Sequence, residues 1–161
     1  MQIIPMRRTD RERSSDFGRR VAAEAPYGVL STVSPEGTPY SIPVSPVLDG
    51  DVLYFHGAAG VGRKRNNMLQ NAKVSMLFVG QCDVAEPEFS VNYRSAIFEG
   101  RAQLVTDETE RLHALWLIAA RYCPSVAPER RSAYMNEAGS RVDIWRIDVE
   151  RITAKSRGTS E

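Results

Sequence analysis

Apolar and polar residues alternate through most of the first two thirds of the chain, with the period of two that half-buried β-strands show. The same rhythm returns near the carboxyl end, in VDIWRIDVERITAK. The long segment SVNYRSAIFEGRAQLV contains Gly100, which predicts a bulge or bend that suits barrel closure. The strands predicted from the pattern cover residues 27–33, 38–44 with a continuation toward Val47, 51–56, 73–79, 90–105 and 142–155.

Helical periodicity is limited to short segments between these strands. Residues 14–25 favour a helix that Pro26 ends, and residues 66–71 could form one or two turns. The clearest helix opens at Asp107, with Glu110 three residues on in a start like a capping box. Its apolar residues recur at helical spacing and are expected in the core or at an interface: Leu112, Leu115, Trp116, Ala119 and Ala120.

The remaining pattern fits one small, mainly β domain. Pro128 and Gly139 bracket a second short helix. Five or six strands with few helices predict a mainly β fold, a small antiparallel β-barrel with flanking helices. At 161 residues, with 42% hydrophobic and 25% charged residues, the chain fits a single domain over residues 1–161, in which residues 1–15 form an extended N-terminal arm.

Charge and cysteine content narrow the possible partners. A formal net charge of +1 gives no global argument for nucleic acid. No apolar run approaches the roughly 20 residues of a membrane span, and the polar start lacks the apolar core of a secretory signal. We therefore expect a cytoplasmic protein that binds neither nucleic acid nor membrane. Cys82 and Cys123 are far apart in sequence, which favours free thiols over a disulfide or a zinc site.

The segment around Asp49 to Arg65 carries the most suggestive chemistry. An Asp49-Gly50 turn separates two apolar runs, and the second run ends at His56. The loop GAAGVG then leads directly into three cations, Arg63, Lys64 and Arg65. Glycines let a backbone approach a ligand closely, so this loop is either a phosphate cradle or an ordinary surface loop with a solvated basic run.

Other catalytic arrangements find little support. The chain has only two histidines, His56 and His113, and neither shows the spacing of a metal site. His113 fits a helix surface or interface, whereas His56 ends a strand beside the glycine loop, where its side chain could meet a ligand. No serine stands in a Gly-x-Ser-x-Gly elbow, and no cysteine neighbours a histidine.

A family resemblance extends over nearly the whole chain. The sequence resembles the flavin-binding split-barrel superfamily, which includes pyridoxamine 5′-phosphate oxidases, and most closely its branch of nitroimidazole-resistance proteins. The motifs that carry it are MRR near the start, YGVLSTV, PYSIPVSPVLDGDVLYFHGAAGVGRK, NAKVSMLFV, NYRSAIFEGRAQLV and WRIDVERITAKSRG.

The resemblance implies a six-stranded antiparallel split β-barrel that forms a homodimer with two FMN sites between the subunits. Arg63 and Lys64 match the basic pair that holds the FMN phosphate, after Gly62. The long predicted strand supplies Arg94 and Ser95 as further polar contacts, and Trp116 and Trp145 are expected in the wall of the partner side. The residues along and beside the flavin ring are Ser41, Ile42, Pro43, Val44, Tyr54, Phe55, His56 and Gly57.

The implied activity is that of an FMN-dependent oxidoreductase acting on a small electron-poor substrate. In nitroimidazole-resistance proteins a nitro group is reduced to an amine, and the histidine equivalent to His56 is associated with the active site. Pyridoxamine phosphate oxidase activity is not expected, because the substrate-binding arginine and histidine near the carboxyl end have no counterpart. The alternatives are a deazaflavin F420 enzyme, a flavin or haem carrier or sensor, with His56 as the axial candidate for haem, and a cofactor-free interaction module.

Overall fold

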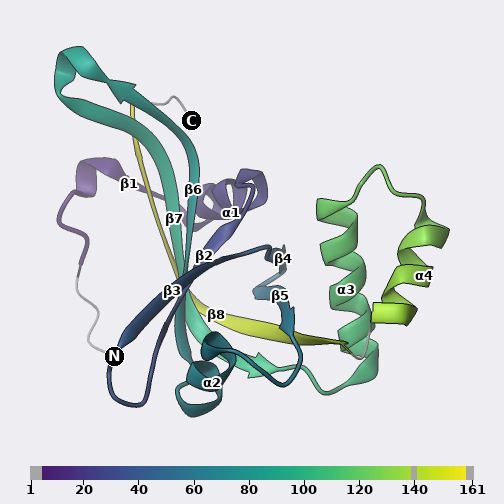
Figure 1. The fold of residues 1–161 in the computed structure, drawn as a ribbon. Coiled ribbons are helices and arrows are strands. Elements are labelled where there is room, and N and C mark those ends of the chain that lie inside the picture. The colour runs from purple at the N-terminus through teal and green to yellow at the C-terminus, as the bar shows by residue number, and fades with distance from the viewer. Residues whose placement is uncertain (1–4, 139–140, 159–161) are drawn as a thin grey trace.

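The computed structural model describes residues 5–138 and 141–158, which form one antiparallel sheet with four flanking α-helices (Figure 1). The helices are α1 (Ser15–Glu24), α2 (Arg63–Gln70), α3 (Glu108–Tyr122) and α4 (Pro128–Ala138), with short 3₁₀-helices at Thr9–Arg11 and Glu86–Glu88. The strands are β1 (Glu12–Arg13), β2 (Gly28–Val33), β3 (Pro39–Val44), β4 (Val47–Asp49), β5 (Val52–Ala58), β6 (Lys73–Ala85), β7 (Ser90–Leu104) and β8 (Val142–Arg157).

A very short link between the two sheet edges forces the sheet to curl. The strand order is β3-β2-β6-β7-β8-β5-β4, which places β3 and β4 at opposite edges without a hydrogen-bonded ladder between them. Only Ser45 and Pro46 separate these strands in sequence, and three Cα-to-Cα steps span at most about 11 Å. The edges therefore approach each other without pairing, which is the geometry of a split barrel and confirms the expected fold class.

The number of strands differs from the expected six. Six strands are long, but the described residues contain eight, because β1 and β4 add two and three residues to the sheet. β1 pairs with β8, with Glu12 opposite Lys155, so part of the N-terminal segment is held in the sheet. Such short ladders carry too few apolar residues for a periodic signal.

The strand expected to run from residue 38 toward Val47 is interrupted. β3 ends at Val44, and buried Pro46, which has no amide hydrogen for a ladder, turns the chain to the opposite edge. The tight turn near Asp49 exists, with Gly50 at a φ of 57°, but it connects the short β4 to β5. The predicted hairpin is therefore real, whereas its first strand is a separate three-residue element.

Gly100 marks an irregularity in the barrel, as predicted. The β7–β8 register shifts between Glu99 and Gly100, which leaves Glu150 as an extra residue on β8. A Cβ atom at Gly100 would lie 2.1 Å from the carbonyl oxygen of Asp148, so no side chain fits there. The close approach of the two backbones explains why the strand needs glycine at this position.

The barrel interior is filled with large apolar side chains. Phe78 and Phe98 meet edge to face with their centroids 5.3 Å apart, and α1 covers one end of the core. The Ser14 hydroxyl caps α1 by accepting a hydrogen bond from the Phe17 amide. Trp145, expected in a cofactor wall, is 1% exposed inside this core, so that expectation is wrong. Side chains that fill the core include Val21, Leu30, Leu53, Phe55, Met76 and Ile147.

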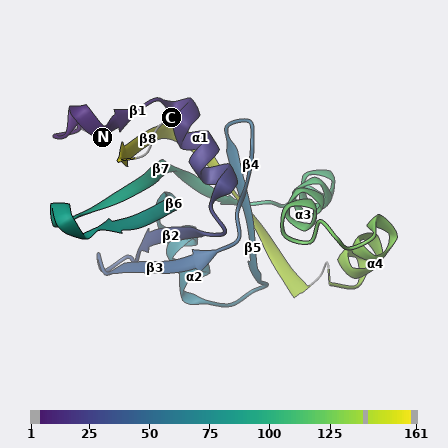
Figure 2. The ribbon, with the colours of Figure 1, turned by 90° about the horizontal axis from the view of Figure 1, so that it is seen from above.

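Helices α3 and α4 lie to one side of the barrel, seen most clearly from above (Figure 2). α3 buries Ala114 and Ile118 against a second apolar cluster that includes Tyr54 of β5. Of the expected apolar face, Leu112 and Trp116 remain 37% and 38% exposed, so a place for them at an interface stays a prediction. Gly139, expected to end the second helix, lies outside the described residues.

Candidate functional site

The three cations after the glycine loop open a helix. The sequence pattern predicts that the cations lie at the tip of the glycine loop. In the structure α2 begins at Arg63, so Arg63, Lys64 and Arg65 form its first turn. The N-cap residue Gly62 has a φ of 111°, no side chain caps the helix, and the first turn contains no acidic residue. Cations are unfavourable at the positive end of a helix dipole, and uncapped amides there bind anions. The start of α2 is thus suited to a phosphate group.

Each cation of this turn has a different environment. Arg65 is held by Asp143 of β8, with Nε 2.8 Å from Oδ2, and the Gly60 amide donates to the same oxygen. The Arg63 guanidinium lies over the ring of Tyr40, 4.6 Å from its centroid. Neither Arg63 nor Lys64 forms an ion pair with another residue that the structure describes. Arg65 therefore fixes the loop, and the other two charges remain available for a ligand.

Lys64 reaches β5 across Gly57. A Cβ atom on Gly57 would stand 3.0 Å from Cε and 3.1 Å from Nζ of Lys64, so the missing side chain makes room for the lysine. The neighbouring His56 is exposed at the surface of the isolated chain. Burial by nearby protein atoms, and secondarily the Lys64 charge, lower the pKa of His56 below its ordinary value. His56 therefore favours the neutral imidazole near pH 7.

Strand β3 connects the cationic turn to a cavity on the far side of His56. Tyr40, at the start of the strand, packs under Arg63, and Ser45, just beyond its end, lines the cavity together with His56. β3 pairs only with β2, so one row of its backbone groups is free of a ladder. The predicted ring-contact residues Ser41, Ile42, Pro43 and Val44 lie between these two points.

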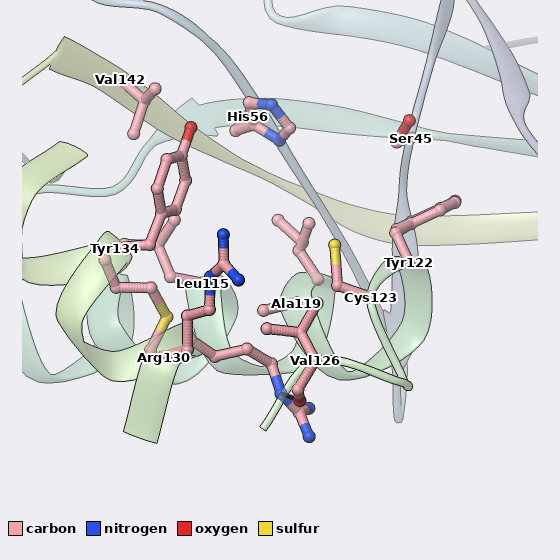
Figure 3. Close-up of a pocket in the computed structure, with 13 residues that line it drawn as sticks. Ser45, His56, Leu115, Ala119, Tyr122, Cys123, Val126, Arg130, Tyr134 and Val142 are labelled. Atoms are coloured by element: carbon pink, nitrogen blue, oxygen red, sulfur yellow. Dashed lines mark hydrogen bonds between the residues drawn. The ribbon is translucent and has the colours of Figure 1, made fainter. Parts of the chain in front are cut away.

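The cavity has a volume of about 440 Å³ and lies between β5 and the helices α3 and α4 (Figure 3). In the close-up, His56 faces the cavity from the barrel side, and Tyr134 and Arg130 face it from α4. Its lining residues are Ser45, His56, Leu115, Ile118, Ala119, Tyr122, Cys123, Val126, Arg130, Arg131, Tyr134, Met135 and Val142.

Other predicted site residues on β5 direct their side chains elsewhere. Phe55 is fully buried in the barrel core. The Tyr54 hydroxyl donates to Oε1 of Glu110 at 2.8 Å, and burial together with this carboxylate raises the pKa of Tyr54 to about 12. The side chains of Tyr54 and Phe55 are buried in the protein interior, so any cofactor contact from these two positions would be made by the backbone.

Arg94 and Ser95 lie far from the cationic turn within one chain. Ser95 pairs with Lys155 of β8, whereas His56 pairs with Ile144, and the intervening stretch of β8 spans roughly 35 Å if extended. The Arg94 guanidinium lies 3.9 Å from the Glu24 carboxylate on α1. A role for this pair at the flavin remains a prediction that requires a second subunit.

Trp116 stands beside the cavity on α3. Its ring lies 6.0 Å from the Arg131 guanidinium, and Trp116 is absent from the cavity lining itself. Its half-exposed ring also remains available to a partner subunit.

The sequence profile of the pyridoxamine 5′-phosphate oxidase family matches residues 18–156. The chain belongs to this family. This match includes the start of α2, β3, His56 and the helices that line the cavity.

Solved structures share the fold at low identity. A putative 5-nitroimidazole antibiotic resistance protein from Bacteroides thetaiotaomicron is 24% identical, with a TM-score of 0.74 over 88% of this chain and 83% of that one. A conserved hypothetical protein from Mycobacterium tuberculosis is 20% identical, with a TM-score of 0.78 over 98% and 97%. An FAD and haem binding protein from Mycobacterium smegmatis is 19% identical, with a TM-score of 0.73 over 91% and 72%. No curated protein sequence matches the chain.

Membrane-spanning helices and metal-binding clusters are both absent from the described residues. No described helix is long and apolar enough to cross a membrane. Within residues 5–138 and 141–158, no group of three or more histidine, cysteine or acidic side chains is arranged to hold a metal ion. Cys82 and Cys123 are both free and exposed, as expected.

Sequence reasoning missed most of the cavity. Arg130, Arg131 and Tyr134 lie on a helix whose sequence has only a weak apolar face, and Ser45 sits in a link between strands. The only available signal is the arginine pair itself, in the first turn of a helix that starts with Pro128. These residues reach the site through the packing of α3 and α4, which leaves no local pattern.

Proposed function

We propose that the protein is a flavin-dependent oxidoreductase that holds FMN and reduces a small electron-poor substrate. The observation that carries this proposal is the first turn of α2, which has uncapped amides, no acidic residue of its own, and two cations that form no ion pair with another described residue. The family match and the FAD and haem binding protein among its structural neighbours support the same assignment. The cofactor supplies the redox chemistry of its isoalloxazine ring, and the protein supplies binding and orientation.

Arg63 and Lys64 hold the phosphate of the cofactor in this proposal. Lys64 offers a point charge beside Gly57, and Arg63 offers a planar guanidinium already ordered on Tyr40. The free backbone row of β3 provides hydrogen-bonding groups for the polar edge of the ring. These groups lie in a continuous path from α2 to His56.

His56 stands where the ring path meets the cavity. In its neutral form it carries one N–H donor and one acceptor nitrogen, so it can hold a proton at a ring nitrogen close to a bound substrate. Its lowered pKa makes the neutral form the major one near pH 7. His56 is thus the candidate catalytic residue: its neutral ring donates a hydrogen bond to the substrate, and it delivers a proton only after the ring itself has been protonated.

A homodimer with flavin sites between its subunits fits the remaining features. The Leu112 and Trp116 side of α3 is exposed and apolar. Arg94 and Ser95 are too far from α2 to act in their own subunit. A second copy could cover the first patch and bring the second pair to the cofactor.

Titration of the purified protein with FMN tests the proposal. Lys64→Met and Arg63→Met should each weaken FMN binding by about tenfold to a hundredfold, because each removes a charged hydrogen bond. Arg101→Gln removes a cation from an exposed position on β7 and should leave the affinity unchanged. Equal FMN affinity in all three variants, or no binding by the unmodified protein, would refute the phosphate site.

Activity requires a separate measurement. With FMN bound, the protein should oxidise reduced nicotinamide in the presence of a nitroaromatic acceptor faster than free FMN does. His56→Ala should lower turnover with flavin content retained. Turnover that His56→Ala leaves unchanged would remove His56 from the mechanism.

A haem-binding function is the second candidate, and one observation favours it. His56 is exposed beside a cavity and favours its neutral form, as an axial ligand must. A Soret band after haem addition that disappears in His56→Ala would support this alternative over the flavin site.

A further inference from the structure

The cavity between the barrel and the helices α3 and α4 has a positively charged lining that the cofactor site does not explain. None of its thirteen lining residues is acidic, whereas two of them, Arg130 and Arg131, are cationic. Two cations in a site without a carboxylate favour an anionic ligand.

The two arginines differ in their availability. Arg131 donates from Nε to the Val126 carbonyl at 2.8 Å and lies against Trp116, so it is fixed in place. Arg130 forms no hydrogen bond or ion pair with any other residue in the described part of the chain. Its planar group can therefore offer a pair of parallel donors to a carboxylate.

The rest of the lining is mainly apolar. Leu115, Ile118 and Ala119 from α3 form one side, and Met135 and Val142 extend it. The volume of about 440 Å³ lies within the range of small-molecule sites, large enough for an aromatic ring with a short substituent. His56 faces this space from the barrel side, opposite the α4 side that carries Arg130 (Figure 3).

We propose that this cavity binds a small aromatic or similarly flat carboxylic acid. Its carboxylate pairs with Arg130, its ring lies on Leu115 and Ala119, and its electron-poor end points toward His56. The role of this acid as a substrate rests on the proposed function. The new elements are the class of substrate and the residue that selects it. Arg130 is then a specificity residue located on α4, far in sequence from the cofactor site.

Calorimetry with two matched probes tests the assignment. The protein should bind 4-nitrobenzoate at least tenfold more tightly than 4-nitrobenzyl alcohol, which has the same ring and nitro group but no charge. Arg130→Gln should remove most of that difference, whereas Arg101→Gln, on an exposed position of β7 outside the cavity, should retain it. Equal affinities for the two probes, or an unchanged preference in Arg130→Gln, would overturn the proposal.

A second variant locates the binding in the cavity. Ala119→Phe places a ring into the space and should weaken binding of both probes at least tenfold, while circular dichroism confirms the fold. Undiminished binding by Ala119→Phe would show that the acid binds elsewhere and would overturn the proposal.

FMN titration of the same variants separates this proposal from the proposed function. FMN affinity that stays constant in Arg130→Gln while the acid preference disappears supports both. A protein that binds no FMN but prefers the acid through Arg130 supports the acid site and refutes the flavin function.

Discussion

The cationic turn of α2 and the cavity under α3 and α4 lie on either side of His56, yet they are built in different ways. The cationic turn belongs to the barrel: Asp143 of β8 holds Arg65, and Gly57 of β5 receives Lys64. The cavity depends on α3, which packs against one side of the barrel, and on α4, which packs on α3 (Figure 2). A rigid part thus presents the candidate cofactor residues, and a separately attached part presents the candidate substrate residues.

Because of this difference, substitutions on α4 should lower the stability of the fold least. α3 is attached by a few specific polar contacts, among them the Tyr122 hydroxyl that donates to the Pro46 carbonyl. The Arg146 guanidinium also bonds Glu110 at 2.6 Å. Sequence changes on α4 alter the cavity without touching the barrel core, so the cavity can vary in specificity while the cofactor end stays constant.

The largest effect is expected when α3 is loosened from the barrel. Arg121 donates from Nη2 to the carbonyl oxygens of Ala22 and Ala25 at the end of α1, both at 2.8 Å. Arg121→Gln should lower the free energy of unfolding by about 2 kcal/mol, because partly buried hydrogen bonds from a charged donor are lost. Binding of 4-nitrobenzoate should weaken with it, and FMN affinity should change less than twofold.

Urea unfolding and the two titrations check this outcome. Arg141→Gln is the matched control, because Arg141 pairs with Glu137 in a largely exposed contact that contributes little. An equal loss of FMN and acid binding in Arg121→Gln would contradict the independence of the two regions.

The same contrast explains what the sequence could predict. His56, Gly57, Arg63 and Lys64 lie within a short segment, so strand and turn rules brought them together, although those rules placed the cations in a loop and began the helix at residue 66. Arg130 faces the cavity across from His56 only because α3 packs on the barrel and α4 packs on α3, through contacts between segments that are distant in sequence. No local period records such contacts, and the buried face of α3, Ala114 and Ile118, was missed for the same reason.

A smaller and purely local effect is expected at Gly57. In Gly57→Ala the new Cβ would stand 3.0 Å from Cε of Lys64, the flexible end of a side chain, so the lysine moves and the strand persists. FMN affinity should fall about tenfold, roughly 1.4 kcal/mol, with acid binding unchanged. Combining Gly57→Ala with Lys64→Met should cost no more than Lys64→Met alone. Additive losses in the double variant would show that Gly57 acts on the cofactor by a route other than Lys64.

The smallest expected effect is the pH dependence at the junction of the two regions. The folded protein lowers the pKa of His56, mainly through burial and secondly through Lys64, so the unfolded chain binds the proton more tightly. The stability that neutral His56 contributes is therefore fully present above its ordinary pKa of about 6.5 and is lost as the pH falls through that value toward the folded pKa. On acidification over this window, the free energy of unfolding, measured in urea, should fall less in His56→Asn than in the unmodified protein.

Lys64→Met should raise the His56 pKa in an NMR titration but leave it below the ordinary value, because burial is the larger cause. A His56 pKa that Lys64→Met does not move would place the lysine farther from the junction than the contact across Gly57 implies.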